Sequence, residues 1–222
     1  MKKYPAILLI LPLIFFVNQP AFAKKRTKTQ GFQIQADTIY SFARHRYSTD
    51  KNYVSTTKFN DSALGGGGSI KYVYNIDNIL PAEPLIPVFI FTEIFGQKIG
   101  TSALDKEKDR ININSRYGMK IGLGSDVADD LFIYISGGVA SVNYEIDWQS
   151  VNKNKAAHKA GLIYGGGIGY HLGKNLIISL EVNNQSLELR TPKIPTGNDE
   201  YGNIIKARTG LIVTQIGLGF QF

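Results

Sequence analysis

Few residues in this chain could do acid–base or metal chemistry, and they are scattered. The 222-residue sequence has no cysteine and three histidines, His45, His158 and His171. None of the histidines has a second ligand at the spacing of a zinc site, and thiolate ligands are absent. The sequence also lacks a nucleophile elbow. We therefore expect no enzyme activity, no catalytic residue, no metal site and no cofactor.

Two glycine runs, Gly65–Gly68 and Gly165–Gly167, could in principle cradle a phosphate group. A phosphate-binding loop also needs a following lysine with serine or threonine, and a helix N-terminus, and neither run has them. Both runs lie in stretches of alternating polarity. We therefore expect these glycines to lie in strands, where they allow a bend, a bulge or close packing against bulky neighbours.

These stretches belong to a period-two pattern that recurs along the chain. At the C-terminus every second residue is mostly apolar, and the residues between are small or polar. Alternation over about 11 residues matches the length of a strand that crosses a membrane. Similar stretches begin near Phe32, Leu64, Val88, Ile111, Leu131, Leu162 and Leu176, which makes eight with the last.

Eight alternating strands favour a closed barrel in a membrane. Lipid offers no hydrogen bonds, so every backbone N–H and C=O must pair, as a closed sheet allows. The connections near 46–61, 98–110, 147–160 and 190–208 are long and polar, and those between them are mostly shorter. We expect an all-β fold, an eight-stranded antiparallel transmembrane β-barrel with short periplasmic turns and long extracellular loops. A soluble sandwich, the alternative, would expose too large an apolar patch.

The alternation also predicts which side chains face the lipid. On the fourth strand we expect Ile111 and Ile113 to point outward together with Tyr117, Met119, Ile121 and Leu123. Two aromatic girdles are expected at the edges of the apolar band. Phe132 would belong to the girdle near the short turns, and Tyr144 and Trp148 to the girdle near the long loops.

The first residues have the three zones of a secretory signal peptide. Lys2 and Lys3 precede an apolar run from Ala6 to Val17, and Ala21-Phe22-Ala23 places small residues at the cleavage positions. A membrane-spanning helix is the alternative, but the run is shorter than the roughly 20 residues required. We expect residues 1–23 to be a signal peptide, 24–30 a basic periplasmic tail serving only solubility, and 31–222 the barrel.

The expected inward positions carry three acids and three bases, namely Asp37, Lys71, Glu93, Arg116, Lys120 and Glu181. An eight-stranded barrel is just wide enough for side chains to fill its interior. We therefore expect these charges to form salt bridges and hydrogen bonds that plug the barrel. A selective ion path is the alternative.

The long connections are basic, in a chain whose formal net charge is +7. Their candidate binding residues are Arg44, Arg46, Lys51, Lys58, Arg190, Lys193, Lys206 and Arg208. A basic rim would attract acidic partners, such as phosphates of lipopolysaccharide, sulfated glycans or acidic patches on host proteins. The alternative is that these residues only solvate the loops. Nucleic acid is not expected, because the chain is exported and has no basic motif with stacking aromatics.

The strand pattern, the glycine-rich inner faces and the ending Gln215–Phe222 resemble small outer-membrane barrels, the family of the OmpA membrane domain and the neisserial opacity proteins. The Lys/Ile/Asn-rich style is also similar to rickettsial adhesins. The resemblance implies a location in the outer membrane of a Gram-negative-type bacterium. It further implies that Ile216, Leu218, Phe220 and Phe222 are read by the barrel-assembly machinery. Adhesion to host surface or serum proteins is the implied function, with envelope integrity or a narrow porin-like channel as alternatives.

Overall fold

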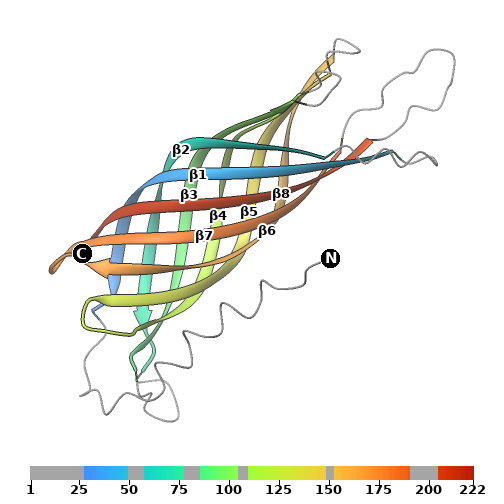
Figure 1. Cartoon of the computed structure of the whole chain (residues 1–222). Coiled ribbons are helices and arrows are strands. Elements are labelled where there is room, and N and C mark those ends of the chain that lie inside the picture. The colour runs from blue at the N-terminus through green and yellow to red at the C-terminus, as the bar shows by residue number, and fades with distance from the viewer. Residues whose placement is uncertain (1–27, 50–57, 78–85, 105–109, 149–152, 191–204) are drawn as a thin grey trace, which may run out of the picture.

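The computed structural model describes residues 28–49, 58–77, 86–104, 110–148, 153–190 and 205–222. Its strands are β1 (Gly31–Thr49), β2 (Lys58–Asn75), β3 (Val88–Leu104), β4 (Arg110–Asp126), β5 (Leu131–Trp148), β6 (Lys153–His171), β7 (Leu176–Arg190) and β8 (Ile205–Gln221). Each strand pairs antiparallel with the next, and β8 pairs with β1, so the sheet closes (Figure 1). The prediction of an eight-stranded antiparallel barrel is confirmed. No helix among the described residues is long and apolar enough to cross a membrane.

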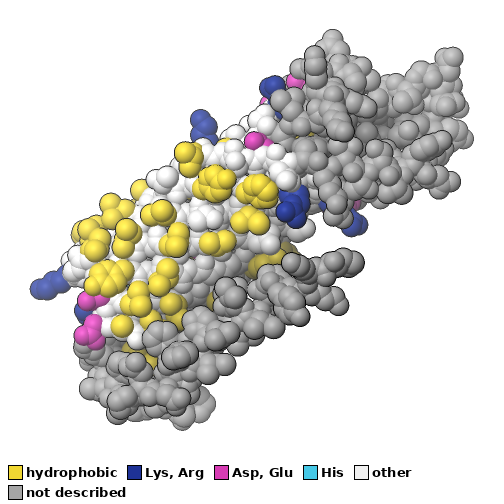
Figure 2. Space-filling model, viewed as in Figure 1, with side chains coloured by type: hydrophobic (Ala, Val, Ile, Leu, Met, Phe, Trp, Pro, Cys, Tyr) yellow, Lys and Arg dark blue, Asp and Glu magenta, His cyan; other side chains and the backbone are white. Residues whose placement is uncertain are grey.

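The outer surface of the barrel carries a broad apolar band. We call the end with the β4–β5 and β6–β7 connections the turn end, and the opposite end the loop end. Large apolar side chains gather over the half nearer the turn end (Figure 2). They are strongly exposed, as Leu64 at 77 % and Leu162 at 72 % illustrate. Water-soluble monomers rarely expose such a continuous apolar surface, so this band is the part of the barrel that lies in lipid.

Strand pairing is continuous around the barrel within the band but not beyond it. The β2–β3 ladder stops at Gly66 and Lys98, and the β6–β7 ladder stops at Ile163 and Gln185. The other ladders continue toward the loop end. The loop end therefore consists of two four-stranded sheets, which diverge in Figure 1. We call β7-β8-β1-β2 the first sheet and β3-β4-β5-β6 the second sheet.

The strands extend further toward the loop end than the sequence pattern predicts. Much of the stretches expected to be loops is strand, including 46–49, 58–61, 98–104, 153–160 and 205–208. The prediction failed because the polarity reverses beyond the apolar band. There the inward residues are apolar and the outward residues are polar, so the stretches no longer look like lipid-facing strands.

A β-bulge in β4 reverses the facing of two isoleucines. The register between β4 and β5 shifts between Ile113 and Ser115. One extra residue turns the side chains beyond it to the opposite face. Ile111 and Ile113 are therefore fully buried inside the barrel, whereas Tyr117 faces outward as expected. The prediction that these two isoleucines face lipid is wrong.

Two residues assigned to the aromatic girdles also point inward. Phe132 is 3 % exposed and Tyr144 is 5 % exposed, and both pack in interior clusters. Their strand, β5, is apolar on both faces over much of its length, so alternation could not decide its facing. The side chain of Trp148 lies outside the described part of the structure. At the turn end an outward girdle does form, with Phe32, Tyr72, Tyr74, Tyr170, Phe220 and Phe222.

The interior is filled by apolar side chains above and below a polar middle. Six buried residues, including Phe89, Phe91 and Tyr134, form the layer near the turn end. Twelve buried residues from both sheets form the layer near the loop end. Glycines make room for the rings: a Cβ added to Gly169 would lie 2.0 Å from the Phe132 ring. The predicted packing of strand glycines against bulky lumen neighbours is therefore confirmed.

Candidate functional site

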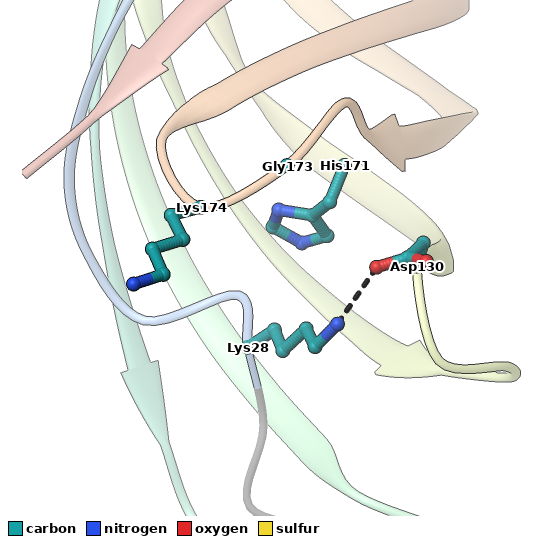
Figure 3. A pocket seen from close by; sticks show the side chains of 5 residues that line it. All are labelled: Lys28, Asp130, His171, Gly173 and Lys174. Atoms are coloured by element: carbon teal, nitrogen blue, oxygen red, sulfur yellow. Dashed lines mark hydrogen bonds and ion pairs between the residues drawn. The ribbon is translucent and has the colours of Figure 1, made fainter.

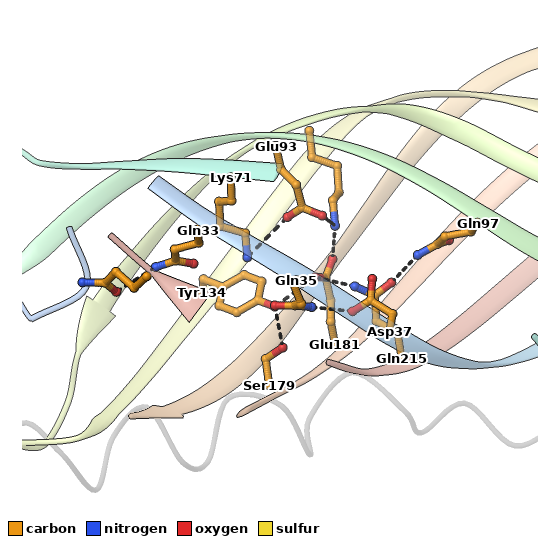
Figure 4. A network of polar contacts seen from close by, with 12 residues as sticks. Gln33, Gln35, Asp37, Lys71, Glu93, Gln97, Tyr134, Ser179, Glu181 and Gln215 are labelled. Carbon is orange, nitrogen blue, oxygen red and sulfur yellow. Dashed lines mark hydrogen bonds and ion pairs between the residues drawn. The ribbon is translucent and has the colours of Figure 1, made fainter. Parts of the chain in front are cut away.

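A chain of buried ion pairs crosses the middle of the barrel. The ammonium of Lys120 on β4 lies 2.8 Å from Glu93 on β3 and 2.6 Å from Glu181 on β7. Lys71 on β2 lies 3.3 Å from the second oxygen of Glu93. Figure 4 shows Lys71, Glu93 and Glu181 pointing toward one another inside the barrel. The ion pairs thus join strands of both sheets across the lumen.

Neutral side chains extend this network. Glu181 Oε2 accepts hydrogen bonds from the Tyr134 hydroxyl at 2.9 Å and from the Gln215 amide at 3.2 Å. Gln97 donates to Gln215 at 2.6 Å and accepts from Arg116 Nε at 2.5 Å. These contacts connect Arg116 to the acidic residues through amides. In the sequence, the two glutamines of this network could be recognised only as polar residues at inward positions.

The structure thus brings four of the six expected lumen charges into direct ion pairs. Asp37 and Arg116 lie in the same layer but have no ion pair among the described residues. Asp37 instead accepts a hydrogen bond from Gln35, which in turn accepts one from Ser179. Arg116 stacks near Phe95, with 5.3 Å between the guanidinium carbon and the ring centroid. Amides and an aromatic face therefore take the place of direct counter-ions at the edges of the cluster.

The polar middle is almost completely screened from solvent. Glu93, Lys120 and Glu181 are 4 % exposed or less. An unpaired ion at such depth loses several kcal/mol of hydration, on the order of the stability of a whole domain. Mutual pairing offsets this loss, and Lys71 gains further from two rings at 4.8 Å. The arrangement stabilises a filled cross-section and presents no exposed reactive group.

The three histidines do not form a site together. His45 is buried in the loop-end layer and bonded to Thr209, whereas His171 lies at the turn end beside Thr29. His158 bonds to Asn143 on the outside of the second sheet. Both His45 and His158 lie on strands. Within the described ranges, no group of three histidines or acids could hold a metal ion.

The segment before β1 binds the turn end of the barrel. Thr29 donates to Asp126 at 2.7 Å, and Lys28 forms an ion pair with Asp130 at 2.7 Å (Figure 3). The side chain of Gln221 donates to the carbonyls of Lys28 and Gln30. The hydrogen bond from Lys28 to Asp130 raises the pKa of Lys28. Lys28–Gln30 are thus part of the folded barrel rather than of a tail that serves only solubility, and 24–27 lie outside the described residues.

A cavity of about 440 Å³ opens beside this segment. Its lining includes Lys28, Asp130, His171, Gly173 and Lys174 (Figure 3). The ammonium of Lys28 is already occupied by Asp130. The cavity therefore offers one exposed lysine, Lys174, and no assembled set of ligand-binding groups among the residues described.

Most of the expected basic binding residues are located at the loop end of the first sheet. Arg44 on β1 and Arg208 on β8 are exposed on the outer side. The backbone register places Arg46 opposite Lys58 on one side and Arg208 on the other, and Arg190 opposite Lys206. These residues lie on strands, so their assignment to loops is wrong. Lys51 and Lys193 lie outside the described residues.

Ile216, Leu218 and Phe220 of the expected assembly signal lie on the outer face of β8, and Phe222 follows the end of this strand. Ile216, Leu218, Phe220 and Phe222 are between 46 and 69 % exposed. They contribute to the apolar band and, at the turn end, to the aromatic girdle. Phe220 and Phe222 pack edge to face, with ring centroids 5.0 Å apart. This placement leaves their role in barrel assembly a prediction from the resemblance.

An apolar outer band, a closed hydrogen-bonded sheet and a filled interior together define an integral membrane β-barrel. The family model described as "Outer membrane protein beta-barrel domain" matches residues 9–222. The chain belongs to this family and is an outer-membrane protein. The resemblance to small outer-membrane barrels is thereby confirmed.

Three solved structures are similar to this chain at low sequence identity. Neisserial surface protein A shares 14 % identity over 87 % of this chain and 98 % of its own, with a TM-score of 0.46. OprG from Pseudomonas aeruginosa shares 13 % identity over 87 % and 96 %, with a TM-score of 0.48. Ail of Yersinia pestis shares 14 % over 87 % and 100 %, with a TM-score of 0.41. A comparison with curated protein sequences gave no match.

Proposed function

We propose that this chain is a surface adhesin whose loop end faces the outside of the cell and binds acidic partners on the host. The observation that carries the proposal is the gathering of basic positions on four neighbouring strands. Arg44, Arg46, Lys58, Arg190, Lys206 and Arg208 all belong to the loop-end part of the first sheet. Lys51 and Lys193, on the connections of the same sheet, would add to this basic face.

Charge favours acidic partners on this face. The acids on the same part of the first sheet are Asp61 and Glu188, so basic residues are in clear excess. The loop end of the second sheet carries Glu145 and Asp147 together with the basic residues Lys98, Arg110, Lys153, Lys155 and Lys159. The excess of positive charge on the first sheet attracts polyanions, and the attraction weakens as salt screens it. Sulfated glycans and acidic patches on host surface or serum proteins fit this chemistry.

The filled lumen favours binding over transport. A solute crossing the barrel would meet both apolar layers as well as the ion pairs of Lys120. Displacing those side chains would expose buried charges and break packed contacts. A narrow channel is therefore a weaker candidate than a binding protein, and a barrel that serves only envelope integrity is the main competitor.

Several parts of the proposal concern partners within the bacterium. Residues 1–23 would direct export as a signal peptide, and the barrel-assembly machinery would read the outward residues of β8. Arg44 and Arg208 lie just beyond the apolar band, at a height where phosphates of lipopolysaccharide would compete with a host ligand. An assay of host binding must therefore be run without lipopolysaccharide first and with it afterwards.

The proposal is tested with refolded barrel in phospholipid nanodiscs and with immobilised heparin as the acidic probe. We expect saturable binding at physiological salt. The variant Arg44→Gln/Arg208→Gln should weaken it by about tenfold, since each exposed charge contributes up to about 1 kcal/mol. Lys98→Gln/Lys174→Gln, which removes the same charge elsewhere, should bind like the wild type. Binding confined to low salt would overturn the proposal and leave the envelope role.

A further inference from the structure

The loop-end part of β6 is a free sheet edge. β6 pairs with β5 along its whole loop-end half, as far as Lys153 opposite Trp148. Its ladder with β7 ends at Ile163, although β7 continues to Arg190. Residues 153–162 therefore have a strand partner on one side only among the described residues.

This edge lies where a partner chain could reach it. Leu162 is the last large apolar residue on the outer face of β6, and Ala160, His158 and Ala156 beyond it are exposed. The edge is thus beyond the apolar band, in water, where unpaired backbone groups are tolerated. An exposed row of N–H and C=O groups is a template for another extended chain.

The β2–β3 ladder also ends before the loop end, but there a side chain connects the two strands. Between β2 and β3, the carboxylate of Asp61 accepts a hydrogen bond from the backbone N–H of Ser102. A side chain thus ties the two sheets together where the β2–β3 ladder has ended. No comparable side-chain bond joins β6 to β7 beyond Ile163 among the described residues.

The side chains of the β6 edge leave room for a neighbour. Ala156, Ala157 and Ala160 are all small, whereas at Gly161 β7 still lies alongside, since an added Cβ would be 2.9 Å from the Ser186 carbonyl oxygen. Ala157 packs against the loop-end apolar layer but is only half-buried. Lys159 has the same facing as Ala157, so the acids of an added strand would lie beside it on the inner side, and its apolar side chains would lie on the outer side beside the exposed Ala156 and Ala160. The small side chains of this edge offer little contact area. Backbone hydrogen bonds would therefore have to supply much of the binding free energy.

Charge specifies the partner further. Lys153, Lys155 and Lys159 belong to this edge, and Lys159 has no ion pair among the described residues. The neighbouring edge of β7 carries Glu188 and would repel an acid. We infer that residues 153–160 of β6 bind an acidic, extended segment of a partner protein, which adds to the second sheet as a further strand. This site lies on the sheet opposite the basic face of the proposed adhesin.

The test uses the full barrel in nanodiscs and a capped peptide of alternating valine and glutamate, about ten residues long to match the edge. Hydrogen exchange of the free protein should be fast at the open-edge amides of 156–160. Adding the peptide should slow exchange there. The same peptide with N-methylated backbone amides keeps its charge but cannot form the backbone hydrogen bonds. Its binding should be weaker by about tenfold at least.

Variants separate this site from the basic face. Lys159→Glu should weaken peptide binding, and Lys98→Glu should leave it unchanged. Arg44→Gln/Arg208→Gln, which tests the adhesin proposal, should also leave peptide binding unchanged, so the two proposals can fail independently. Full protection of every amide in 156–160 without peptide would overturn the inference, as would equal binding of the N-methylated peptide.

Discussion

Lys120 is the centre of the buried ion-pair chain, and replacing it with methionine tests whether that chain stabilises the barrel. Methionine fills a similar volume but cannot neutralise an acid. The change leaves Glu93 with Lys71 at 3.3 Å as its remaining cation. Glu181 keeps only hydrogen bonds from Tyr134 and Gln215. The variant therefore strands one carboxylate of a balanced cluster in the interior.

The magnitude follows from burial. The side chains of Lys120, Glu93 and Glu181 are only 1–2 % exposed. Removing one partner of so buried a pair lowers the free energy of unfolding by about 3–5 kcal/mol. Because both acids keep some of their contacts, we expect the free energy of unfolding to fall by about 3 kcal/mol. The double variant Lys120→Met/Glu181→Gln restores charge balance, so it should recover about 2 kcal/mol relative to the sum of the single changes.

The assay is reversible urea unfolding of the barrel in lipid vesicles, with the midpoint and slope converted to free energies. Lys98→Met, which removes an exposed lysine from β3, is the control and should change stability by less than about 0.5 kcal/mol. A loss below about 1 kcal/mol for Lys120→Met would refute the reasoning. So would a double variant whose loss equals the sum of the two single losses.

Three further substitutions test other features of the barrel. Gly169→Ala should destabilise it by about 1–3 kcal/mol in the same urea assay, because the new methyl group meets an aromatic ring at 2.0 Å. Gly210→Ala, which meets nothing within 4 Å, should not. Ile113→Ala should lower stability by about 2–4 kcal/mol if the bulge turns it inward, whereas Asn114→Ala should have little effect; similar losses would contradict the bulge. Thr29→Val should speed amide exchange at the β4–β5 turn, and unchanged exchange would show that its bond does not hold the turn.

The sequence was sufficient to predict the barrel because lipid imposes a strict pattern on its strands. Every backbone group must pair and every outward residue in the band must be apolar. Alternation such as that of β8 therefore indicates a membrane-crossing strand. Inward charges such as Lys71 and Glu93 were found by the same parity. The prediction thus worked where one physical constraint governs every residue.

The same reasoning failed where the constraint changes. Ile111 and Ile113 lie on the loop-end side of a bulge, and a single extra residue cannot be seen in a pattern of apolar and polar letters. Beyond the band, water replaces lipid outside and apolar packing replaces charge inside, so strands were mistaken for loops. The binding of Lys28 and Thr29 to Asp130 and Asp126 joins residues about a hundred positions apart and has no local signal.

The most direct test of the proposed function is attachment of bacteria that display this chain to cultured host cells. Bacteria that display the wild-type chain would be compared with bacteria that display Arg44→Gln/Arg208→Gln or Lys98→Gln/Lys174→Gln. The amount of the chain on the bacterial surface would be the same in each strain. We expect attachment with the wild type and the second variant, and a marked loss with the first. Equal attachment by all three, or none above bacteria without the chain, would contradict a basic adhesive face on the first sheet.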